Sequence, residues 1–425
     1  MLVQVSLYGE SLGTVDWNEQ KGSAVFQYSE SSYTNPREPS PLLMPKEGRT
    51  YETNRDHINF HNLPYLLSDS MPDDFGNVMM KEWLKQKSIT YDDINPVDRL
   101  TYVGKRGMGA LEYQPINHNS SNNFSVDVTE LLEVAKNVLE GKKDVKYKGL
   151  NKESLTDILR IGTSVGGARA KALIAIKEDE KGNIIEIKPG DIIQPSGYSY
   201  WLLKIDGANK KSLGESDGTG KIEYAYYKMA RSSGIDMSES RIYNENGRSH
   251  FLTKRFDRSE QGEKIHMQTF GSLIGADFKT QKASSYETLF RTMKRLKSNY
   301  QQLEQQFRRA VFNVVARNHD DHVKNFSFLM DKQGVWKISP AYDITYSYNP
   351  GGTWTSVHQS SINGKFDVFK RGDLIEFGEN FGIKNNKLII QEIIEAVSKW
   401  DQIAQEVEIP KKIISMIKNN LRLKL

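Results

Sequence analysis

The segment Asn318 to Asn325, which reads N-H-D-D-H-V-K-N, concentrates ionisable side chains in one predicted loop. In a kinase catalytic loop an Asp accepts the proton of the substrate hydroxyl, and an Asn five positions later holds magnesium. Asp320 and Asn325 have that spacing, and Asp343 follows in P-A-Y-D after a predicted hairpin, where a second metal ligand belongs. One carboxylate and one amide oxygen suit the octahedral oxygen preference of Mg²⁺. The order of helix, loop, hairpin and Asp therefore predicts phosphoryl transfer.

Two other interpretations of this loop remain open. A polar turn that caps a hairpin would explain each Asp and Asn separately. Alternatively, His319, Asp320, Asp321 and His322 could belong to a His-Asp metal phosphohydrolase, in which imidazoles and carboxylates bind a transition metal. That enzyme class needs further histidines, and the chain has only eight, with no companion pair at helical ligand spacing. The kinase interpretation is therefore favoured.

A glycine-containing segment upstream could bind phosphate. Thr163 to Lys171 reads T-S-V-G-G-A-R-A-K, in which Gly166 and Gly167 would let backbone N–H groups approach phosphate oxygens. Arg169 and Lys171 would add positive charge. The segment lacks the Walker spacing of glycines before Lys-Ser/Thr, so a plain tight turn between strands is the alternative.

Two further segments carry kinase-like features. Lys204 lies in the apolar strand pattern Y-W-L-L-K-I, where a kinase places the Lys that contacts phosphates, and Glu223 in a following helix could orient it. A solvent-facing helix Glu is the alternative for Glu223. Lys254 to Phe256, in T-K-R-F-D-R, would offer backbone hydrogen bonds and an apolar ring to adenine, although an ordinary edge strand would look similar.

The elements that must position these residues change from β-rich to helical along the chain. Leu303, Phe307, Val311 and Val314 recur at helical spacing and predict an amphipathic helix just before the catalytic loop. Strands are predicted at 2–7, 24–28, 172–176, 200–205 and 251–256, with turns at Gly9 and Gly13, and helices at 221–231, 387–407 and 411–425. The predicted fold class is α+β with a small β-rich lobe and a larger helical lobe, and a nucleotide would suit the cleft between them.

A polar run rich in Asn and Ser, residues 115–123, marks a surface connection. We therefore expect an N-terminal subdomain at 1–115, a connecting segment at 116–150, a kinase small lobe at 151–257 and a helical large lobe at 258–425.

Composition excludes several classes of protein. The 425 residues contain no cysteine, so disulfides, thiolate metal sites and cysteine nucleophiles are ruled out. The net charge of +4 is too mild to indicate nucleic-acid binding by itself, and the clusters of Lys at 142–148 and 411–424 are typical of solvated faces. The sequence lacks both a signal-peptide pattern and an apolar run of about 18 residues, which predicts a cytoplasmic protein without membrane association.

Taken together, these motifs resemble the HipA family, the kinase toxins of bacterial toxin–antitoxin pairs. The resemblance begins with D-S-M-P-D-D-F-G at 69–76 and Y-V-G-K-R-G-M-G-A-L-E-Y at 102–113. It continues through G-G-A-R-A-K, R-F-D-R and N-H-D-D-H-V-K-N to P-A-Y-D-I, and so spans roughly residues 60 to 345. Several motifs in one order are more specific than any single motif.

The resemblance implies a two-lobed, protein-kinase-like (HipA-like) fold and a serine/threonine kinase that uses ATP and Mg²⁺. Asp320 would be the catalytic base, and Asn325 and Asp343 the metal ligands. The family's ATP-binding positions correspond to Gly166, Gly167, Ala168, Arg169, Ala170, Lys171, Lys204, Lys254, Arg255, Phe256, His322, Val323, Lys324, Asn325, Tyr342 and Asp343. Lys254 departs from the family pattern, because a known family member carries an acid there, which implies a rearrangement of the ribose or adenine contacts.

The resemblance also implies regulation and partners. Ser164 stands at the place of the family's self-phosphorylated loop serine, with Thr163 as the neighbouring alternative. Family members bind a small helix-turn-helix antitoxin (HipB-like) on operator DNA, and Lys365, Lys370 and Arg371 could contact the phosphate backbone or be ordinary solvated cations. The best-known substrate is glutamyl-tRNA synthetase. A kinase-shaped corepressor without transfer activity is the alternative function.

Overall fold

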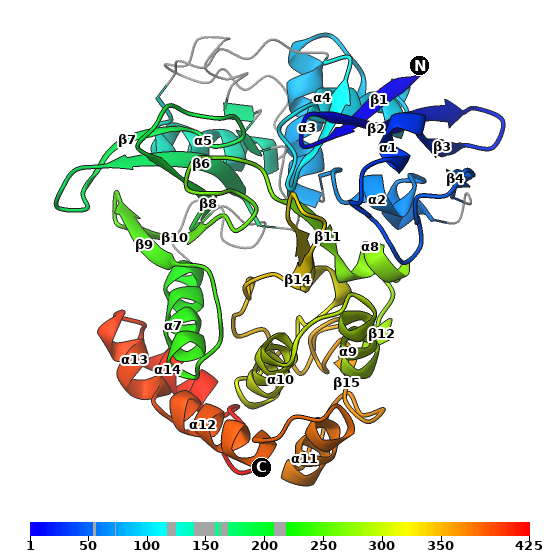
Figure 1. Ribbon diagram of the computed structural model, residues 1–425. Coiled ribbons are helices and arrows are strands. Elements are labelled where there is room, and N and C mark those ends of the chain that lie inside the picture. Colours follow the sequence, from blue (N-terminus) through cyan, green and yellow to red (C-terminus); the bar gives the residue numbers. More distant parts are fainter. Residues whose placement is uncertain are drawn as a thin grey trace. The chain divides into compact units, whose positions relative to one another are not determined.

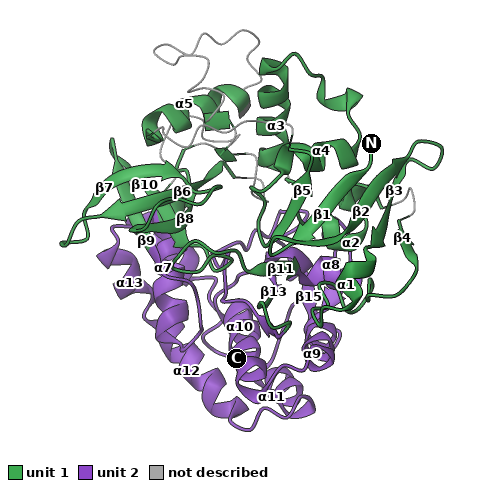
Figure 2. Ribbon diagram, turned by 45° about the horizontal axis from the view of Figure 1, so that its top comes forward, with its two compact units in different colours: residues 1–220, 241–268, 330–334 green, residues 221–240, 269–329, 335–425 purple. Residues whose placement is uncertain are grey.

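The chain divides into two units whose segments alternate along the sequence. The computed structural model describes residues 1–53, 57–72, 74–116, 125–139, 158–159, 161–162, 169–207 and 218–425. Unit 1 comprises 1–220, 241–268 and 330–334, and unit 2 comprises 221–240, 269–329 and 335–425 (Figure 2). No helix within the described residues is long and apolar enough to cross a membrane.

Unit 1 begins with a five-stranded antiparallel sheet in the order β4-β3-β2-β1-β5 (Figure 1). Its strands are β1 (Val3–Leu7), β2 (Glu10–Asn18), β3 (Ser23–Tyr28), β4 (Thr50–Glu52) and β5 (Leu111–Gln114). Val3, Val5 and Leu7 are buried on one face of β1, as the predicted alternation requires. Gly9 lies in the turn after β1, as expected. Gly13 does not: it lies within β2, where an added Cβ would stand 2.2 Å from the carbonyl oxygen of Gln27.

Short helices and a second sheet complete unit 1. The helices are α1 (Glu30–Tyr33), η1 (Ile58–Phe60), α2 (Tyr65–Ser68), α3 (Asp74–Gln86), η2 (Tyr91–Asp93), α4 (Pro96–Val103) and α5 (Val128–Leu139). The second sheet has the order β7-β6-β8-β10-β9, with β6 (Lys171–Glu178), β7 (Ile184–Pro189), β8 (Tyr198–Lys204), β9 (Ser240–Glu245) and β10 (Arg248–Lys254). Trp83 of α3 and Leu131 of α5 share one apolar core with Ile174 and Trp201 of this sheet. The strands predicted at 172–176, 200–205 and 251–256 are confirmed as β6, β8 and β10.

Unit 2 is mainly helical. Its helices are α7 (Thr219–Ser232), α8 (Phe270–Ile274), α9 (Tyr286–Arg295), α10 (Tyr300–Val315), η3 (Val323–Asn325), α11 (Arg371–Asn380), α12 (Asn386–Ser398), α13 (Trp400–Glu406) and α14 (Lys411–Lys418). The strands of unit 2 are β12 (Ser284–Ser285), β14 (Trp336–Ile338) and β15 (Ser360–Ser361). Two more strands run across the division between the units: β11 (His266–Thr269), which lies mostly in unit 1, and β13 (Ser327–Met330), which lies mostly in unit 2. The single helix predicted over 387–407 is in fact two helices, α12 and α13, which meet at Lys399.

The helix before the catalytic loop is α10, as predicted from its apolar spacing. Its N-cap is Asn299, whose side chain accepts a hydrogen bond from the backbone N–H of Gln302. Phe307, Val311 and Val314 are fully buried. Because one face of α10 is locked into the core, the loop that follows starts from a rigid support.

Candidate active site

The predicted catalytic loop leaves α10 through a left-handed residue and ends in one turn of 3₁₀ helix. Arg317 has φ 61°, which turns the chain out of the helix. His322 caps η3, because its Nδ1 accepts a hydrogen bond from the backbone N–H of Lys324 at 3.2 Å. Since Nδ1 is an acceptor, the ring proton belongs on Nε2. That nitrogen lies 3.7 Å from Oδ1 of Asp320, so the imidazole faces the carboxylate with its N–H.

Asp320 has a fixed backbone and an accessible side chain. Its N–H donates to the Ser347 hydroxyl at 2.9 Å, and its carbonyl accepts from Nδ2 of Asn325 at 2.7 Å. The side chain is 44% exposed. A carboxylate that is accessible while its backbone is held at both ends is suited to accept a proton from a substrate.

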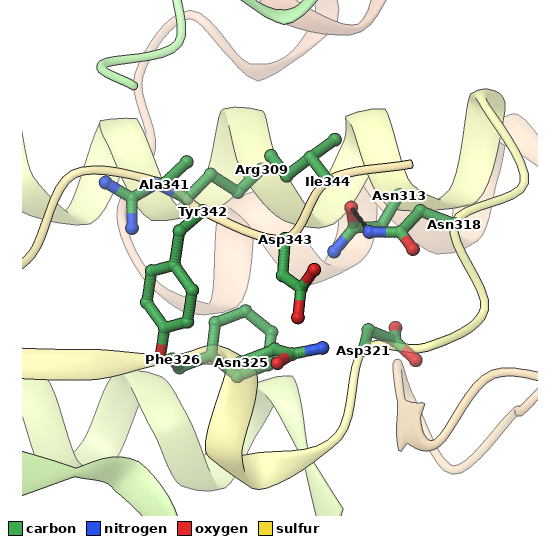
Figure 3. A pocket seen from close by; sticks show the side chains of 10 residues that line it. All are labelled: Arg309, Asn313, Asn318, Asp321, Asn325, Phe326, Ala341, Tyr342, Asp343 and Ile344. Carbon is green, nitrogen blue, oxygen red and sulfur yellow. Dashed lines mark hydrogen bonds between the residues drawn. The ribbon is translucent and has the colours of Figure 1, made fainter. Parts of the chain in front are cut away.

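Asn325 and Asp343 line the same pocket within unit 2. Asp343 follows β14 with φ 55°, in the left-handed region. Figure 3 shows its carboxylate directed toward the amide of Asn325. The full lining is Arg309, Asn313, Asn318, Asp321, Asn325, Phe326, Ala341, Tyr342, Asp343 and Ile344.

The donor atoms at this pocket fit magnesium. Asn325 uses its Nδ2 to hold the carbonyl of Asp320, which directs Oδ1 away from that contact. A carboxylate and an amide oxygen, with water and phosphate oxygens beside them, are the ligands that Mg²⁺ takes in phosphoryl-transfer sites. The pair Asn325 and Asp343 could therefore hold the metal.

Tyr342 ties the hairpin to the end of the loop. Its hydroxyl lies 2.6 Å from the carbonyl oxygen of Lys324 and 2.6 Å from the hydroxyl of Ser327 at the start of β13. The Lys324 ammonium lies over the ring of Phe278, 4.2 Å from its centroid. The predicted residues His322, Lys324, Asn325, Tyr342 and Asp343 are thus gathered around one loop.

Asp321, which the sequence assigned only to the metal alternative, is the structural centre of the loop. Its side chain is fully buried. Oδ2 accepts from the Tyr286 hydroxyl and from His358 Nδ1, both at 2.9 Å, and Oδ1 accepts from the N–H of Gln359 at 2.7 Å and of Ser360 at 3.3 Å. Burial raises the pKa of Tyr286 well above its usual value, which keeps that hydroxyl a donor. The sequence offers one signal for this role, which is that Asp321 stands beside Asp320 in N-H-D-D-H. Spacing alone does not tell which of the two carboxylates organises the loop.

The metal-phosphohydrolase alternative has no support within the described residues, where no group of three His, Cys, Asp or Glu side chains could hold a metal ion. His319 is fully buried, and its Nδ1 donates to the carbonyl of Thr355 at 3.1 Å. Burial, together with the nearby His358, Arg422 and Arg317, lowers the pKa of His319 to about 2. The ring is therefore a neutral, hydrogen-bonded core group.

In unit 1, Lys171 and Lys204 are direct partners across β6 and β8. Both are buried. Their register places two cationic side chains on neighbouring strands of the same sheet. The Lys204 ammonium also lies 5.7 Å from the ring centroid of Phe251 on β10. Glu223, in unit 2, is buried, which contradicts the alternative of a solvent-facing helix residue.

The R-F-D-R segment divides its side chains between surface and interior. Lys254 is partly exposed and pairs with Glu260 at 2.8 Å. Arg255 is buried and donates to both oxygens of Asp257, at 2.9 and 2.8 Å, and to the carbonyl of Gly190 at 2.7 Å. The guanidinium of Arg255 is thus directed into the protein, and only its backbone could face a nucleotide. Phe256 is half-buried.

Part of the predicted phosphate loop lies outside the described residues: Thr163, Ser164, Val165, Gly166, Gly167 and Ala168. Arg169 is half-buried and Ala170 is buried. Of the three cations suggested for DNA contact, Lys365 pairs with Asp373 at 2.6 Å, while Lys370 caps α11 and Arg371 is its first residue.

The fold and the loop geometry together define an α+β, two-lobed protein-kinase-like protein. Two family patterns match the chain, one described as HipA-like C-terminal domain at residues 163–401 and one as HipA N-terminal domain at residues 3–114. The chain therefore belongs to the HipA family, as the sequence motifs predicted.

The chain is similar to curated bacterial relatives and to a solved HipA structure. A Haemophilus influenzae protein named "Putative kinase" is 25% identical over 301 residues, covering 62% of this chain and 81% of the relative. A Sinorhizobium fredii protein of the same description, Y4dM, is 25% identical over 253 residues, covering 56% of this chain and 58% of that protein. HipA from the Shewanella oneidensis MR-1 toxin–antitoxin system, solved as a complex of HipA, HipB and operator DNA, matches with a TM-score of 0.67 and 15% identity, covering 98% of this chain and 95% of that one. At this identity the structural match shows the fold alone.

Proposed function

We propose that the chain is a serine/threonine kinase that transfers the γ-phosphate of ATP to a protein hydroxyl. The observation that carries the proposal is the grouping of an accessible Asp320 with Asn325 and Asp343 around one loop, in the order that phosphoryl transfer uses. The names of the curated relatives point to the same activity.

In the proposed reaction, Asp320 is the base. The substrate hydroxyl oxygen forms a bond to the γ-phosphorus while the bond from that phosphorus to the β–γ bridging oxygen breaks, and ADP leaves. The hydroxyl proton passes to the carboxylate of Asp320. The Nε2–H of His322 faces that carboxylate, with Nε2 3.7 Å from Oδ1, and the hydrogen bond from Asn325 to the Asp320 carbonyl fixes the loop. Magnesium, held by Asn325 and Asp343, would supply neutralisation of the phosphate charge.

The remaining nucleotide contacts follow the family resemblance. The backbone of Gly166 to Ala170 would approach the phosphates, and Lys171 and Lys204, which are neighbours across β6 and β8, would supply positive charge to them. The backbone of Lys254 to Phe256 would contact adenine. His322 to Asn325, with Tyr342 and Asp343, would form the side that carries the metal. In this proposal, residues 151–257 act as the small lobe and 258–425 as the large lobe, after the N-terminal subdomain (1–115) and a connecting segment (116–150).

We further propose regulation by self-phosphorylation at Ser164, in the phosphate loop. Ser164→Ala should remove most of the self-phosphorylation, because the acceptor hydroxyl is lost. Peptide mapping by mass spectrometry would check this, and phosphate found on Thr163 instead would reassign the acceptor.

The partners we propose are a HipB-like helix-turn-helix antitoxin, operator DNA reached through that antitoxin, and a protein substrate such as glutamyl-tRNA synthetase or another synthetase. The solved Shewanella complex contains a HipA, a HipB and operator DNA, which supports the first two. The pairing of Lys365 with Asp373 favours a structural role for this Lys over direct contact with the DNA backbone.

The test is incubation of the purified protein with Mg²⁺ and ATP labelled on the γ-phosphate, comparing wild type with Asp320→Asn. The variant should lose transfer by a factor of 10² or more, roughly the contribution of a general base, while still binding ATP. Glu379→Gln, at an exposed carboxylate of α11, is the matched control and should retain full activity. Undiminished transfer by Asp320→Asn would refute the assignment of the base, and absence of transfer by unphosphorylated wild type would favour a corepressor.

A further inference from the structure

The segment that follows α14 is bonded to the end of α10, where the catalytic loop begins. The backbone N–H of Arg422 donates to the carbonyl of Val315 at 2.9 Å. In the other direction, Nε of Arg317 donates to the carbonyl of Asn420 at 2.7 Å. Residues 420–422 are therefore attached to the last turn of α10 and to the first residues of the loop.

The guanidinium of Arg422 is mostly buried and points at His358. Its Nη1 lies 3.4 Å from Nε2 of His358, and it forms an ion pair with Asp367. It also lies over the ring of Phe369, 5.4 Å from the centroid. Burial and the neighbouring Arg317 lower the pKa of Arg422 to about 10, so the group remains a cation at neutral pH.

His358 connects this cation to the catalytic loop. The ring is fully buried, its Nδ1 donates to Asp321, and it lies beside the His319 ring, with 4.1 Å between centroids and an angle of 36° between the planes. Asp321 in turn accepts from Gln359, Ser360 and Tyr286, as described above. The hydroxyl of Ser360 also donates to the backbone carbonyl of Asp321 at 2.6 Å.

We propose that Arg422 is a positioning residue for phosphoryl transfer: by holding His358 it holds Asp321, and with it the backbone of the neighbouring Asp320. This inference rests on the proposed kinase function. Arg422 does not line the pocket that contains Asn325 and Asp343, so its effect reaches the reaction only through the loop. In this proposal, the segment after α14 helps to fix the position of the catalytic loop.

The expected consequence is a loss of turnover without a loss of nucleotide affinity. When Arg422 is replaced, His358 loses the cation on its Nε2 side and can rotate, which removes one of the four donors to Asp321. A small displacement of a catalytic base reduces rate by about tenfold to a hundredfold. The KM for ATP should stay within twofold, because Lys204, Asn325 and Asp343 are untouched.

The test compares wild type, Arg422→Met, Arg422→Lys and Lys418→Met. Met keeps the apolar stem of Arg422, and Lys418 is a matched control because its exposed ammonium pairs with the exposed Asp401 on neighbouring helices. Steady-state kcat and KM for ATP are measured together with hydrogen exchange of the peptides that cover 318–326 and 357–361. We expect Arg422→Met to lower kcat by tenfold or more and to accelerate exchange in both peptides, Arg422→Lys to recover part of each, and Lys418→Met to change neither.

Two results would overturn the inference. One is unchanged kcat and exchange in Arg422→Met. The other is a rise in KM that matches the fall in kcat, which would indicate general loss of structure. Should Arg422→Met fail to fold, His358→Gln is measured in the same way, with the same expected and contrary results. If wild type shows no phosphate transfer, the proposed kinase function is wrong. The hydrogen-exchange data decide independently whether Arg422 holds the loop.

Discussion

Asp257 and Asp321 are both fully buried carboxylates, yet they are satisfied in opposite ways. Asp257, in unit 1, is held by the guanidinium groups of Arg255 and Arg258 and by the N–H of Gly109. Asp321, in unit 2, is held by a hydroxyl, an imidazole and two backbone N–H groups. Asp257 neutralises the charge of the two buried guanidinium groups, whereas Asp321 accepts hydrogen bonds that hold its loop in one conformation. We therefore expect replacement of Asp257 to reduce stability and replacement of Asp321 to reduce activity.

The largest effect should follow from Asp257→Ala. The change leaves two buried cations without their carboxylate, and removal of one partner from a buried ion pair costs about 3–5 kcal/mol. Urea unfolding followed by tryptophan fluorescence would measure it. Glu180→Ala, at an exposed turn of the same unit, is the control and should be neutral. A loss below about 1 kcal/mol would show that the network does not need its anion.

A smaller loss of stability, but a larger loss of activity, should follow from Asp321→Asn. The amide keeps the shape but replaces one acceptor oxygen by a donor, which leaves buried donors unsatisfied at a cost of about 1–3 kcal/mol. Phosphate transfer should fall by more than tenfold while ATP binding persists. If the transfer activity and the stability of Asp321→Asn equal those of wild type, Asp321 does not organise the loop.

Acid titration separates two buried groups whose pKa values are lowered for different reasons: neighbouring cations lower that of Asp257, and burial lowers that of His266. Burial alone would raise the pKa of Asp257, but Arg255 and Arg258 hold it well below the usual range, so its stabilising effect is present above about pH 4 and is lost as pH falls through the lowered pKa.

His266 is the opposite case, because burial lowers its pKa to about 4. Below pH 6.5 the unfolded chain takes up a proton at this position that the folded chain does not, so stability falls as pH drops from 6.5 toward 4. Between pH 7 and pH 5 the loss from this residue should be about 2 kcal/mol. His266→Gln should reduce that difference in urea midpoints, and an unchanged difference would show that other groups cause it.

The smallest effect on stability should follow from Lys254→Met. This Lys forms a surface pair with Glu260, and such pairs contribute about 0–1 kcal/mol. The KM for ATP should nevertheless rise if Lys254 contacts the nucleotide. A KM equal to that of wild type would remove Lys254 from the proposed site.

The local pattern predicted the elements whose periodicity is strong. The apolar spacing of α10 and the alternation in β1 each follow from one buried face, whereas β6 is buried on both faces and is apolar nearly throughout. Because glycine is common in turns, its presence predicts a turn at Gly13, whereas the actual place of Gly13 in β2 follows from the close approach of β3. The break at Lys399 also escaped prediction, because the apolar spacing runs through both helices.

By itself, the sequence determined the family and the spacing of Asp320, Asn325 and Asp343, because these depend on motifs of a few residues in order. The tertiary structure decided which of the two adjacent Asp residues is accessible and which is buried. The donors to Asp321 come from Tyr286 and from residues 358–360, and Arg422 reaches His358 from beyond α14. Contacts between residues so far apart in the chain produce no repeating pattern in the sequence, because each contact involves only two side chains that come together after the core has formed.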